Sequence, residues 1–307
     1  MQRVFSYRQG DRAEYLAHYI LSAIAITVPV PRQEDVGSDF HCSLLRRTEQ
    51  NLRPYLPFDI QIKSCGQKVK KEGVPFGGTT DTGKWRQHEI DQLCQTDTPF
   101  LIGLVDLKEQ WIDIFSTLTR YFAVCRWRNK VANARQINLM PYEPQSCDDL
   151  GDGTETELAE LPGMPRNLWK LPLGQPICRI SIEDSEDADK CEEIKTLLER
   201  YLRMDQENGV FARIGLGYFN WPVKIQTDQP LAAEAFGFVP RANGTVDYNK
   251  QLLVAGKIAA SLLCSYKVSG EKAAIKAWEP VLAELPIKNE PQPVQNAIKE
   301  ALEYANS

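Results

Sequence analysis

The sequence lacks the patterns that mark several large classes of protein. Its eight cysteines are scattered without a Cys-x-x-Cys pair, which argues against a zinc finger and against a compact disulfide scaffold. No apolar run approaches the roughly 18 residues that can span a membrane, and the first residues lack the apolar stretch of a secretion signal. Internal repeats and low-complexity tracts are also missing. These absences favour a cytoplasmic globular protein with reduced, mostly packed thiols.

Histidine is scarce, which restricts the chemistry further. The three histidines are His18, His41 and His88, and no two have the spacing of a metal-binding helix pair. No segment resembles the nucleophile elbow of a serine hydrolase. A histidine-rich metal centre and a hydrolase of that type are therefore disfavoured.

Length and composition are those of an ordinary globular protein. The chain has 307 residues, 43% of them hydrophobic and 25% charged, and a chain of this length commonly forms about two domains. The net charge is −5, but it is unevenly spread. Residues 46–86 carry nine Lys or Arg against four acids, whereas residues 143–160 and 183–193 carry seven acids each. Local basic segments keep nucleic acid open as a partner.

The N-terminal half predicts a mixed sheet flanked by helices. Apolar spacing predicts a helix from Asp11 to about Ile26 with Glu14 near its start. Strands are expected at 40–45 and 58–64 around a turn at 48–57, and again at 100–107 and 111–115. Residues 68–86 read as a polar loop and 88–94 as a short helix.

A second domain is expected after a proline-rich connection. Residues 141–176 contain six prolines and the first acidic block, so they are expected to be a linker between domains at 1–140 and 177–307. The second domain reads as α+β and largely helical. Its expected elements are a strand at 177–182, a helix at 188–204, aromatic strands within 210–225, and helices from 248 onward, near 273–285 and 294–305.

Two short segments carry the candidate chemistry. The first is Gly37-x-Asp39, before the strand at 40–45, and the second is Gln61-x-Lys63 in the next strand. In the second strand Phe58, Ile60 and Ile62 alternate with Asp59, Gln61 and Lys63. One face is therefore expected to be apolar and the other to present Gln61 and Lys63 side by side. The hairpin would bring Asp39 close to them.

The order of these residues resembles a nuclease superfamily. A helix bearing Glu14, then Gly37-x-Asp39, then Gln61-x-Lys63 resembles the PD-(D/E)xK, or restriction-endonuclease-like, superfamily, and its Mrr and DUF4365-like branch with Gln-x-Lys in particular. The resemblance covers residues 10–117. It implies that Asp39 is the main metal ligand and Gln61 the second, with Ile62 supplying a backbone carbonyl. Lys63 would orient the attacking water and contact the phosphate, and Glu14 would be a further acid.

The implied cofactor is a divalent cation. Hard oxygen ligands with little charge suit Mg²⁺ or Mn²⁺, which would neutralise the phosphodiester and activate water. Simpler readings stay open, because Gln and Lys are common on a polar strand face, and an acid in a first helical turn is favoured by the helix dipole. His41, on the Asp39 side of its strand, could transfer a proton, contact phosphate or be structural.

Basic residues elsewhere are candidates for contacts to nucleic acid. Residues 78–84 have the glycine and lysine spacing of a P-loop, but Trp85 stands where Ser or Thr would hold Mg²⁺. Lys84 and Arg86 are instead expected to contact a nucleic-acid backbone. Arg126, Arg128 and Lys130 share a segment with aromatic residues and could do the same, or could be the solvated side of an amphipathic helix.

The sequence therefore predicts an Mg²⁺- or Mn²⁺-dependent endonuclease, with DNA favoured over RNA as substrate. By resemblance it would be the effector of a bacterial anti-phage or restriction system, acting as a homo-oligomer or with a partner protein and without a membrane. The alternative is a non-catalytic adaptor or sensor subunit with a nuclease-like fold, which Gln61 in place of glutamate and the acidic net charge keep open.

Overall fold

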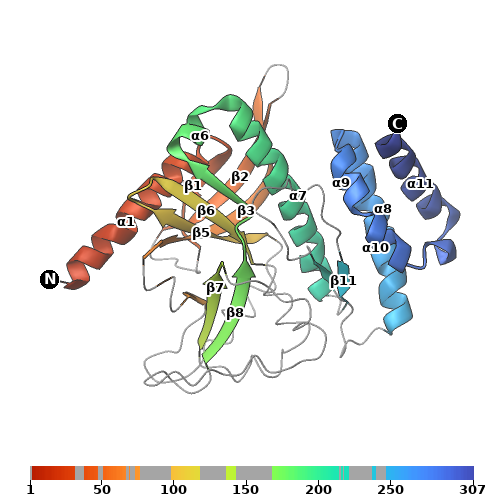
Figure 1. Cartoon of the computed structure of the whole chain (residues 1–307), viewed down its shortest axis with the longest axis horizontal. Coiled ribbons are helices and arrows are strands. Elements are labelled where there is room, and N and C mark those ends of the chain that lie inside the picture. Colours follow the sequence, from red (N-terminus) through yellow and green to blue (C-terminus); the bar gives the residue numbers. More distant parts are fainter. Residues whose placement is uncertain are drawn as a thin grey trace. The chain divides into compact units, whose positions relative to one another are not determined.

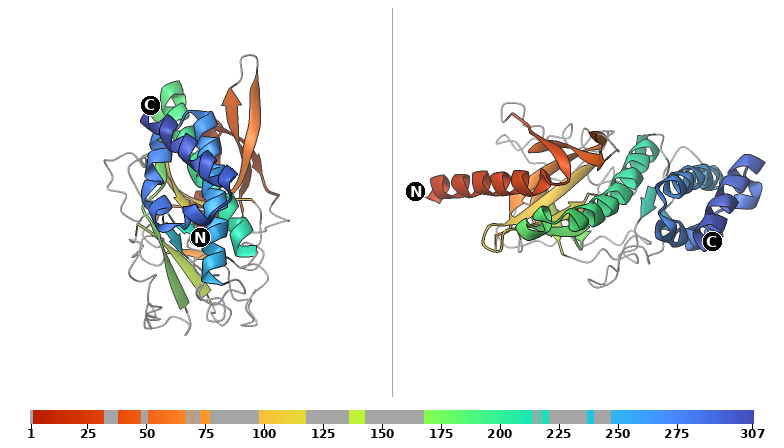
Figure 2. Two further views of the ribbon diagram at one scale, coloured as in Figure 1. Left: turned by 90° about the vertical axis from the view of Figure 1, so that its right-hand side faces the viewer. Right: turned by 90° about the horizontal axis from the view of Figure 1, so that it is seen from above.

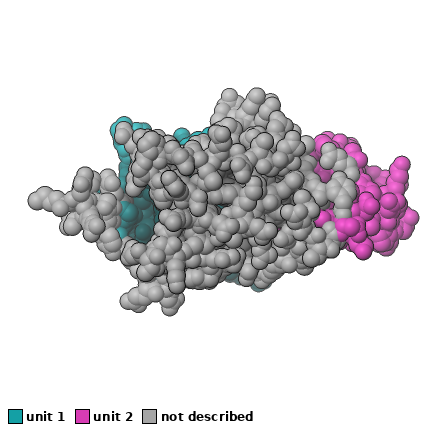
Figure 3. Space-filling model, turned by 90° about the horizontal axis from the view of Figure 1, so that it is seen from below, with its two compact units in different colours: residues 1–120, 128–206 teal, residues 121–127, 207–307 magenta. Residues whose placement is uncertain are grey.

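A computed structural model describes most of the chain as two compact units. The described residues are 2–31, 38–47, 51–66, 69, 73–76, 98–117, 136–142, 168–213, 216, 218–220, 237–239 and 247–307. The first unit comprises residues 1–120 and 128–206, and the second comprises residues 121–127 and 207–307 (Figure 3).

The first unit is built on a mixed six-stranded sheet (Figure 1). Its strand order is β1-β2-β3-β5-β6-β9, with β3 and β5 parallel and the other neighbours antiparallel. The strands are β1 (Ala25–Pro29), β2 (Phe40–Arg47), β3 (Leu52–Ser64), β5 (Phe100–Asp106), β6 (Trp111–Ser116) and β9 (Cys178–Ser181). The α/β class and the mixed sheet flanked by helices are confirmed.

Helix α1 (Gln2–Leu21) lies against one face of this sheet (Figures 1 and 2). Ala13, Ala17 and Ile20 are buried on the helix, and the ring of His18 lies 5.6 Å from the ring of Phe40. Phe40 pairs with Ile60 across β2 and β3, so α1 covers the face that carries these two side chains. We call it the apolar face, and the opposite side of β2 and β3 the polar face.

Two expected boundaries near this face are wrong. The helix predicted from Asp11 to Ile26 begins at Gln2 and ends at Leu21, because Ile26, Thr27 and Val28 are β-branched and pair as a strand with β2. The turn predicted at 48–57 is shorter, since β3 already starts at Leu52 and pairs with Arg47. A bulge between Leu44 and Leu45 accommodates Pro54 within this long hairpin.

A smaller sheet occupies part of the expected linker. Its order is β4-β7-β8, formed by β4 (Val74–Phe76), β7 (Gln136–Pro141) and β8 (Leu168–Gly174). The division of the chain therefore differs from the expected linker at 141–176. Because β9 pairs with β6, the chain after this region returns to the first unit, and the unit boundary falls at residues 206 and 207. Residues 143–167 lie outside the described part.

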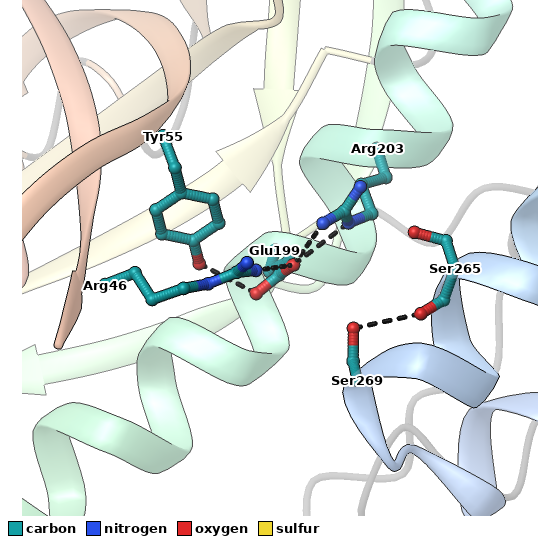
Figure 4. A network of polar contacts seen from close by, with 6 residues as sticks. All are labelled: Arg46, Tyr55, Glu199, Arg203, Ser265 and Ser269. Atoms are coloured by element: carbon teal, nitrogen blue, oxygen red, sulfur yellow. Dashed lines mark hydrogen bonds and ion pairs between the residues drawn. The ribbon is translucent and has the colours of Figure 1, made fainter. Parts of the chain in front are cut away.

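The first unit continues through α6 (Ile182–Glu186) into α7 (Ala188–Arg213), which confirms the strand and helix predicted there. A buried carboxylate, Glu199, fixes α7 to the β2–β3 hairpin (Figure 4). It accepts hydrogen bonds from Arg46 at 3.1 Å, Tyr55 at 2.7 Å and Arg203 at 2.6 Å. Burial and the bond to Glu199 raise the pKa of the Tyr55 phenol.

The second unit is largely helical, as predicted. Its elements are β10 (Tyr218–Asn220), β11 (Gly237–Val239), α8 (Tyr248–Ser269), α9 (Lys272–Ala277), α10 (Glu279–Glu284), a 3₁₀ turn η3 (Ile287–Asn289) and α11 (Gln292–Asn306). Helices α8, α9 and α11 pack together around Tyr266 and Trp278, which are almost fully buried (Figure 1). Within the predicted strand region 210–225, residues 210–213 belong to α7, and β10 is the strand found among the described residues.

Among the described residues, α8 contains one stretch, Asn249–Ser269, that is long and apolar enough to cross a membrane. Buried core helices meet the same criterion, and α8 buries Ala255, Ala259 and Leu263. The stretch does not locate the protein, so the cytoplasmic site stays a prediction.

Candidate functional site

The polar face of β3 presents the predicted side chains. Phe58, Ile60 and Ile62 are buried, whereas Asp59, Gln61 and Lys63 alternate with them and are half-buried. The period-2 pattern of this strand is therefore confirmed. Gln61 and Lys63 lie next to each other on one side of the sheet.

The backbone of β3 at Ile62 extends past the end of the β2 ladder. The N–H groups of Asp59 and Cys65 donate toward β5, to Pro99 at 2.8 Å and Val105 at 2.7 Å. The N–H and C=O of Ile62, an even-numbered residue between them, consequently point toward β2. The β2 ladder ends where Phe40 pairs with Ile60, so both groups of Ile62 lie past the end of that strand.

Asp39 fills this position. Its carboxylate Oδ2 accepts a hydrogen bond from the Ile62 N–H at 2.6 Å, and its own N–H donates to the Ile60 carbonyl at 2.9 Å. The Val30 N–H donates to the Asp39 carbonyl at 2.9 Å, which fixes the backbone on the β1 side as well. The structure therefore brings the Asp39 carboxylate to Ile62, the residue between Gln61 and Lys63, as the predicted hairpin requires. The same contact also gives Asp39 a structural role as a cap of the ladder.

The oxygen atoms around this point suit a hard cation. A carboxylate (Asp39), an amide (Gln61) and a backbone carbonyl directed toward the end of β2 (Ile62) offer one negative charge in total. Mg²⁺ accepts such a sparse set because it keeps several waters. No cluster of three His, Cys, Asp or Glu occurs in the part of the chain that the structure describes, so any metal site here would depend on neutral oxygens. These donors fit the predicted cofactor, which itself stays a prediction.

Glu14 lies on a different side of the sheet. It is half-buried in α1, one turn before His18, whose ring contacts Phe40 on the apolar face. It is not in the first turn of the helix, so the helix-dipole explanation for this acid does not apply. A contribution of Glu14 to a metal bound by Asp39 would have to come around the end of β2, and it stays a prediction.

Asp59 forms a contact that the alternation of the strand does not reveal. Its carboxylate lies 2.6 Å from Nδ1 of His41. The two residues are direct cross-strand partners in β2 and β3, which explains the contact. Of the roles left open for His41, a hydrogen-bonded ring on the polar face is the one the geometry supports.

A second polar cluster on the same side of the sheet was missed. Asp113 of β6 is fully buried and accepts from Arg179 Nε at 2.7 Å and from the Tyr142 hydroxyl at 2.6 Å. The Arg179 guanidinium also lies 3.9 Å from the centre of the Trp111 ring. Burial and the bond to Asp113 raise the pKa of Tyr142.

Tyr142 is held in an uncommon backbone conformation. Its φ is 64°, which costs a non-glycine residue about 1–2 kcal/mol. The Tyr142 N–H donates to the Gly174 carbonyl at 2.9 Å, and the ring packs edge-on against Phe115. These contacts aim the hydroxyl at Asp113, so the smaller sheet covers β6 at this point.

The predicted nucleic-acid contacts lie outside the described residues. They are Lys84, Arg86, Arg126, Arg128 and Lys130, together with the P-loop-like segment and the short helix at 88–94. They stay predictions.

The cysteines of the described part are free thiols, as expected. Cys42 and Cys191 are buried, and burial raises the pKa of the Cys42 thiol to about 12. A thiol with such a pKa is protonated at neutral pH and is a poor nucleophile. Cys42 is therefore a packing residue of the apolar face and is not a candidate nucleophile.

Comparison of the chain with protein-family models, with curated proteins and with solved structures finds no significant match.

Proposed function

We propose that the protein is a metal-dependent nuclease that hydrolyses phosphodiester bonds at Asp39, Gln61 and Lys63. The observation that carries the proposal is the 2.6 Å contact of the Asp39 carboxylate with the Ile62 N–H. It joins an acid directly before the start of β2 to Ile62, the residue between Gln61 and Lys63 in β3. This arrangement agrees with the resemblance to the PD-(D/E)xK superfamily, in which neighbouring strands supply the acid and the lysine.

Each residue has a role that its position permits. A divalent ion bound at this point would neutralise charge on the phosphate and lower the pKa of a bound water. Asp39 would supply the negative charge for binding it, with oxygens of Gln61 and Ile62 beside it. Lys63 is half-buried on the same face as Gln61, where its ammonium group can contact a non-bridging phosphate oxygen or orient water. DNA is the favoured substrate, and a role in anti-phage defence follows from the resemblance alone.

One observation favours the adaptor as a second candidate. Asp39 already caps the Ile62 N–H, and Gln61 brings no charge, so the same geometry serves a purely structural purpose. An adaptor would bind nucleic acid or a partner protein without cutting.

The test uses a substitution that separates the two roles of Asp39. Asp39→Asn keeps an oxygen that can accept from the Ile62 N–H but removes the charge that a cation needs. We expect Asp39→Asn and Lys63→Ala each to lower Mg²⁺- or Mn²⁺-dependent cleavage of plasmid DNA at least about a hundredfold. Lys108→Ala is the matched control, because its side chain is 89% exposed on the turn between β5 and β6.

Circular dichroism should show that all three variants are folded. Cleavage that survives both Asp39→Asn and Lys63→Ala would remove this site. A wild-type chain that binds DNA but cuts neither DNA nor RNA with either metal would favour the adaptor.

A further inference from the structure

Only part of the polar face of the sheet is accessible. On β5 and β6, Ile102, Leu104 and Phe115 are fully buried although they lie on this side. On β1, Val28 is 52% exposed, and the side chain of His41 on β2 is 55% exposed. The open surface therefore lies over β1 and β2 and narrows at β3, where the side chain of Asp59 is 20% exposed.

One row of side chains crosses this open surface next to Asp39. Val28 pairs with His41, and His41 pairs with Asp59, so the three side chains lie in line across β1, β2 and β3. We call them the stacking row. The contact of 2.6 Å between His41 Nδ1 and Asp59 Oδ1 fixes the orientation of an otherwise exposed ring. It also places the ring N–H beside the Asp59 carboxylate, which reduces the repulsion between that carboxylate and a phosphate.

The stacking row has a defined spacing from the proposed cleavage site. Asp39 and Gln61 each lie two residues from it along their strands, which corresponds to about 6.6 Å. This is close to the length of one nucleotide in an extended single strand. A chain whose phosphate lies beside Asp39 and contacts the Lys63 ammonium group would therefore place its neighbouring base over His41.

We propose that the stacking row binds a base of a single-stranded nucleic acid, next to a phosphodiester that Lys63 contacts beside Asp39. This inference rests on the proposed nuclease function and specifies its substrate class. Unpaired bases stack on ring side chains of flat sheet surfaces. Bases of an intact duplex are stacked on one another and present only their edges in the grooves. The exposed side chain of Val28 and the exposed ring of His41 suit the first geometry.

The experiment measures binding without cutting. Fluorescence anisotropy in EDTA would compare a fluorescein-labelled 12-nucleotide DNA strand with the same strand in a duplex, using the full chain. We expect the single strand to bind more tightly. His41→Ala should weaken that binding about tenfold or more, as loss of one stacked base does, and should leave duplex binding unchanged. His41→Phe, which keeps a ring, should retain the affinity, and Val268→Ser, at a residue that is 90% exposed in the second unit, is the control.

The outcomes distinguish this inference from the nuclease itself. If His41→Ala weakens single-strand and duplex binding equally, or weakens neither while Lys63→Ala weakens both, stacking is overturned and the cleavage site stands. If His41→Phe loses affinity as His41→Ala does, a ring is not the recognised feature and the inference fails. If the wild-type chain neither binds the oligonucleotides nor cuts DNA with metal, the proposed function fails and the inference fails with it.

Discussion

Asp113 is a single residue on which several contacts of the first unit depend. Its buried carboxylate accepts from the side chains of Arg179 and Tyr142, which come from β9 and from the end of β7. A buried acid of this kind is costly unless every oxygen is paired. Here the partners come from two sheets, so one side chain holds β6, β9 and the strained Tyr142 together.

Asp113→Asn is expected to lower the free energy of unfolding by about 2–4 kcal/mol, because an amide cannot accept from all of these donors. The loss should stay below that for a fully enclosed pair, since the Arg179 side chain is 54% exposed and can turn toward water. Tyr142→Phe removes one donor and should cost about 1–2 kcal/mol. Urea unfolding at pH 7 measures both.

The matched control for this prediction is Glu109→Gln. Glu109 pairs with Lys108 but its side chain is 57% exposed, so the change should stay within about 0.5 kcal/mol. An Asp113→Asn variant as stable as this control would show that the cluster contributes nothing to the fold.

The polar contacts differ in how far a sequence can reveal them. The alternation of residues 58–63 and the approach of Asp39 to Gln61 follow from local periodicity and a hairpin. The pair of His41 and Asp59 needs the strand register, which the unexpected length of β3 obscured. Asp113 and Arg179 are 66 residues apart in sequence, so no local pattern joins them.

At the scale of elements, α8 contains a glycine that leaves room for a side chain from a neighbouring segment. Gly256 lies inside the helix, where glycine costs about 1 kcal/mol relative to alanine. A Cβ added to it would lie 2.6 Å from Oε1 of Glu290, the residue that follows η3. The missing side chain therefore lets the segment between η3 and α11 approach α8.

We expect Gly256→Ala to stabilise the wild-type chain by less than the roughly 0.5–1 kcal/mol that helix propensity offers, because the Glu290 carboxyl group must move aside. In a Glu290→Ala chain the space is free, so Gly256→Ala should stabilise by the full amount of about 0.5–1 kcal/mol. Thermal or urea unfolding of the four chains gives this cycle.

Gly10→Ala in α1 is the control for the cycle, because a Cβ there meets nothing within 4 Å. It should stabilise the wild-type chain by about 0.5–1 kcal/mol. Equal effects of Gly256→Ala with and without the Glu290 side chain would mean that the two residues do not touch.

Element types were easier to predict than element ends. The strands β5, β6 and β9 and the helices α7, α8 and α11 follow from apolar period and length. The start of α1 and the end of α7 do not, since both helices continue past a glycine, Gly10 in α1 and Gly209 in α7. The remaining boundaries depend on tertiary pairing. Residues 52–57 were predicted to belong to a turn, but they pair with β2 as a strand despite two prolines.

At the scale of the whole molecule, the proline-rich region was expected to separate two domains. The structure divides the chain inside α7, because β8 and β9 return to sheets of the first unit. Proline content signals irregular backbone, but it does not reveal that a later strand pairs with an earlier sheet. Long-range pairing of this kind has no signature in local composition.

A buried carboxylate in the second unit leads to a prediction about how the stability of that unit depends on pH. Glu290 of the second unit is 4% exposed, and neither of its carboxylate oxygens has a hydrogen-bond partner among the residues that the structure describes. Burial raises its pKa above the ordinary value of 4.5, and Lys257 partly opposes the rise. Below that value the acid is protonated in the folded and unfolded chain alike. As the pH rises above it, the unfolded chain loses the proton first, so the folded unit loses stability.

Glu290→Gln replaces the ionisable carboxyl group by an amide of the same size. We therefore expect the variant to match the wild type near pH 4 and to become the more stable of the two as the pH rises, in the second unit specifically. Hydrogen exchange measured by mass spectrometry resolves this, with peptides of α8 and α11 compared with those of α1 and β5. Lys257→Met should enlarge the difference, because it removes the charge that stabilises ionised Glu290. Parallel pH curves for Glu290→Gln and wild type would show that Glu290 ionises as easily in the folded unit as in the unfolded chain.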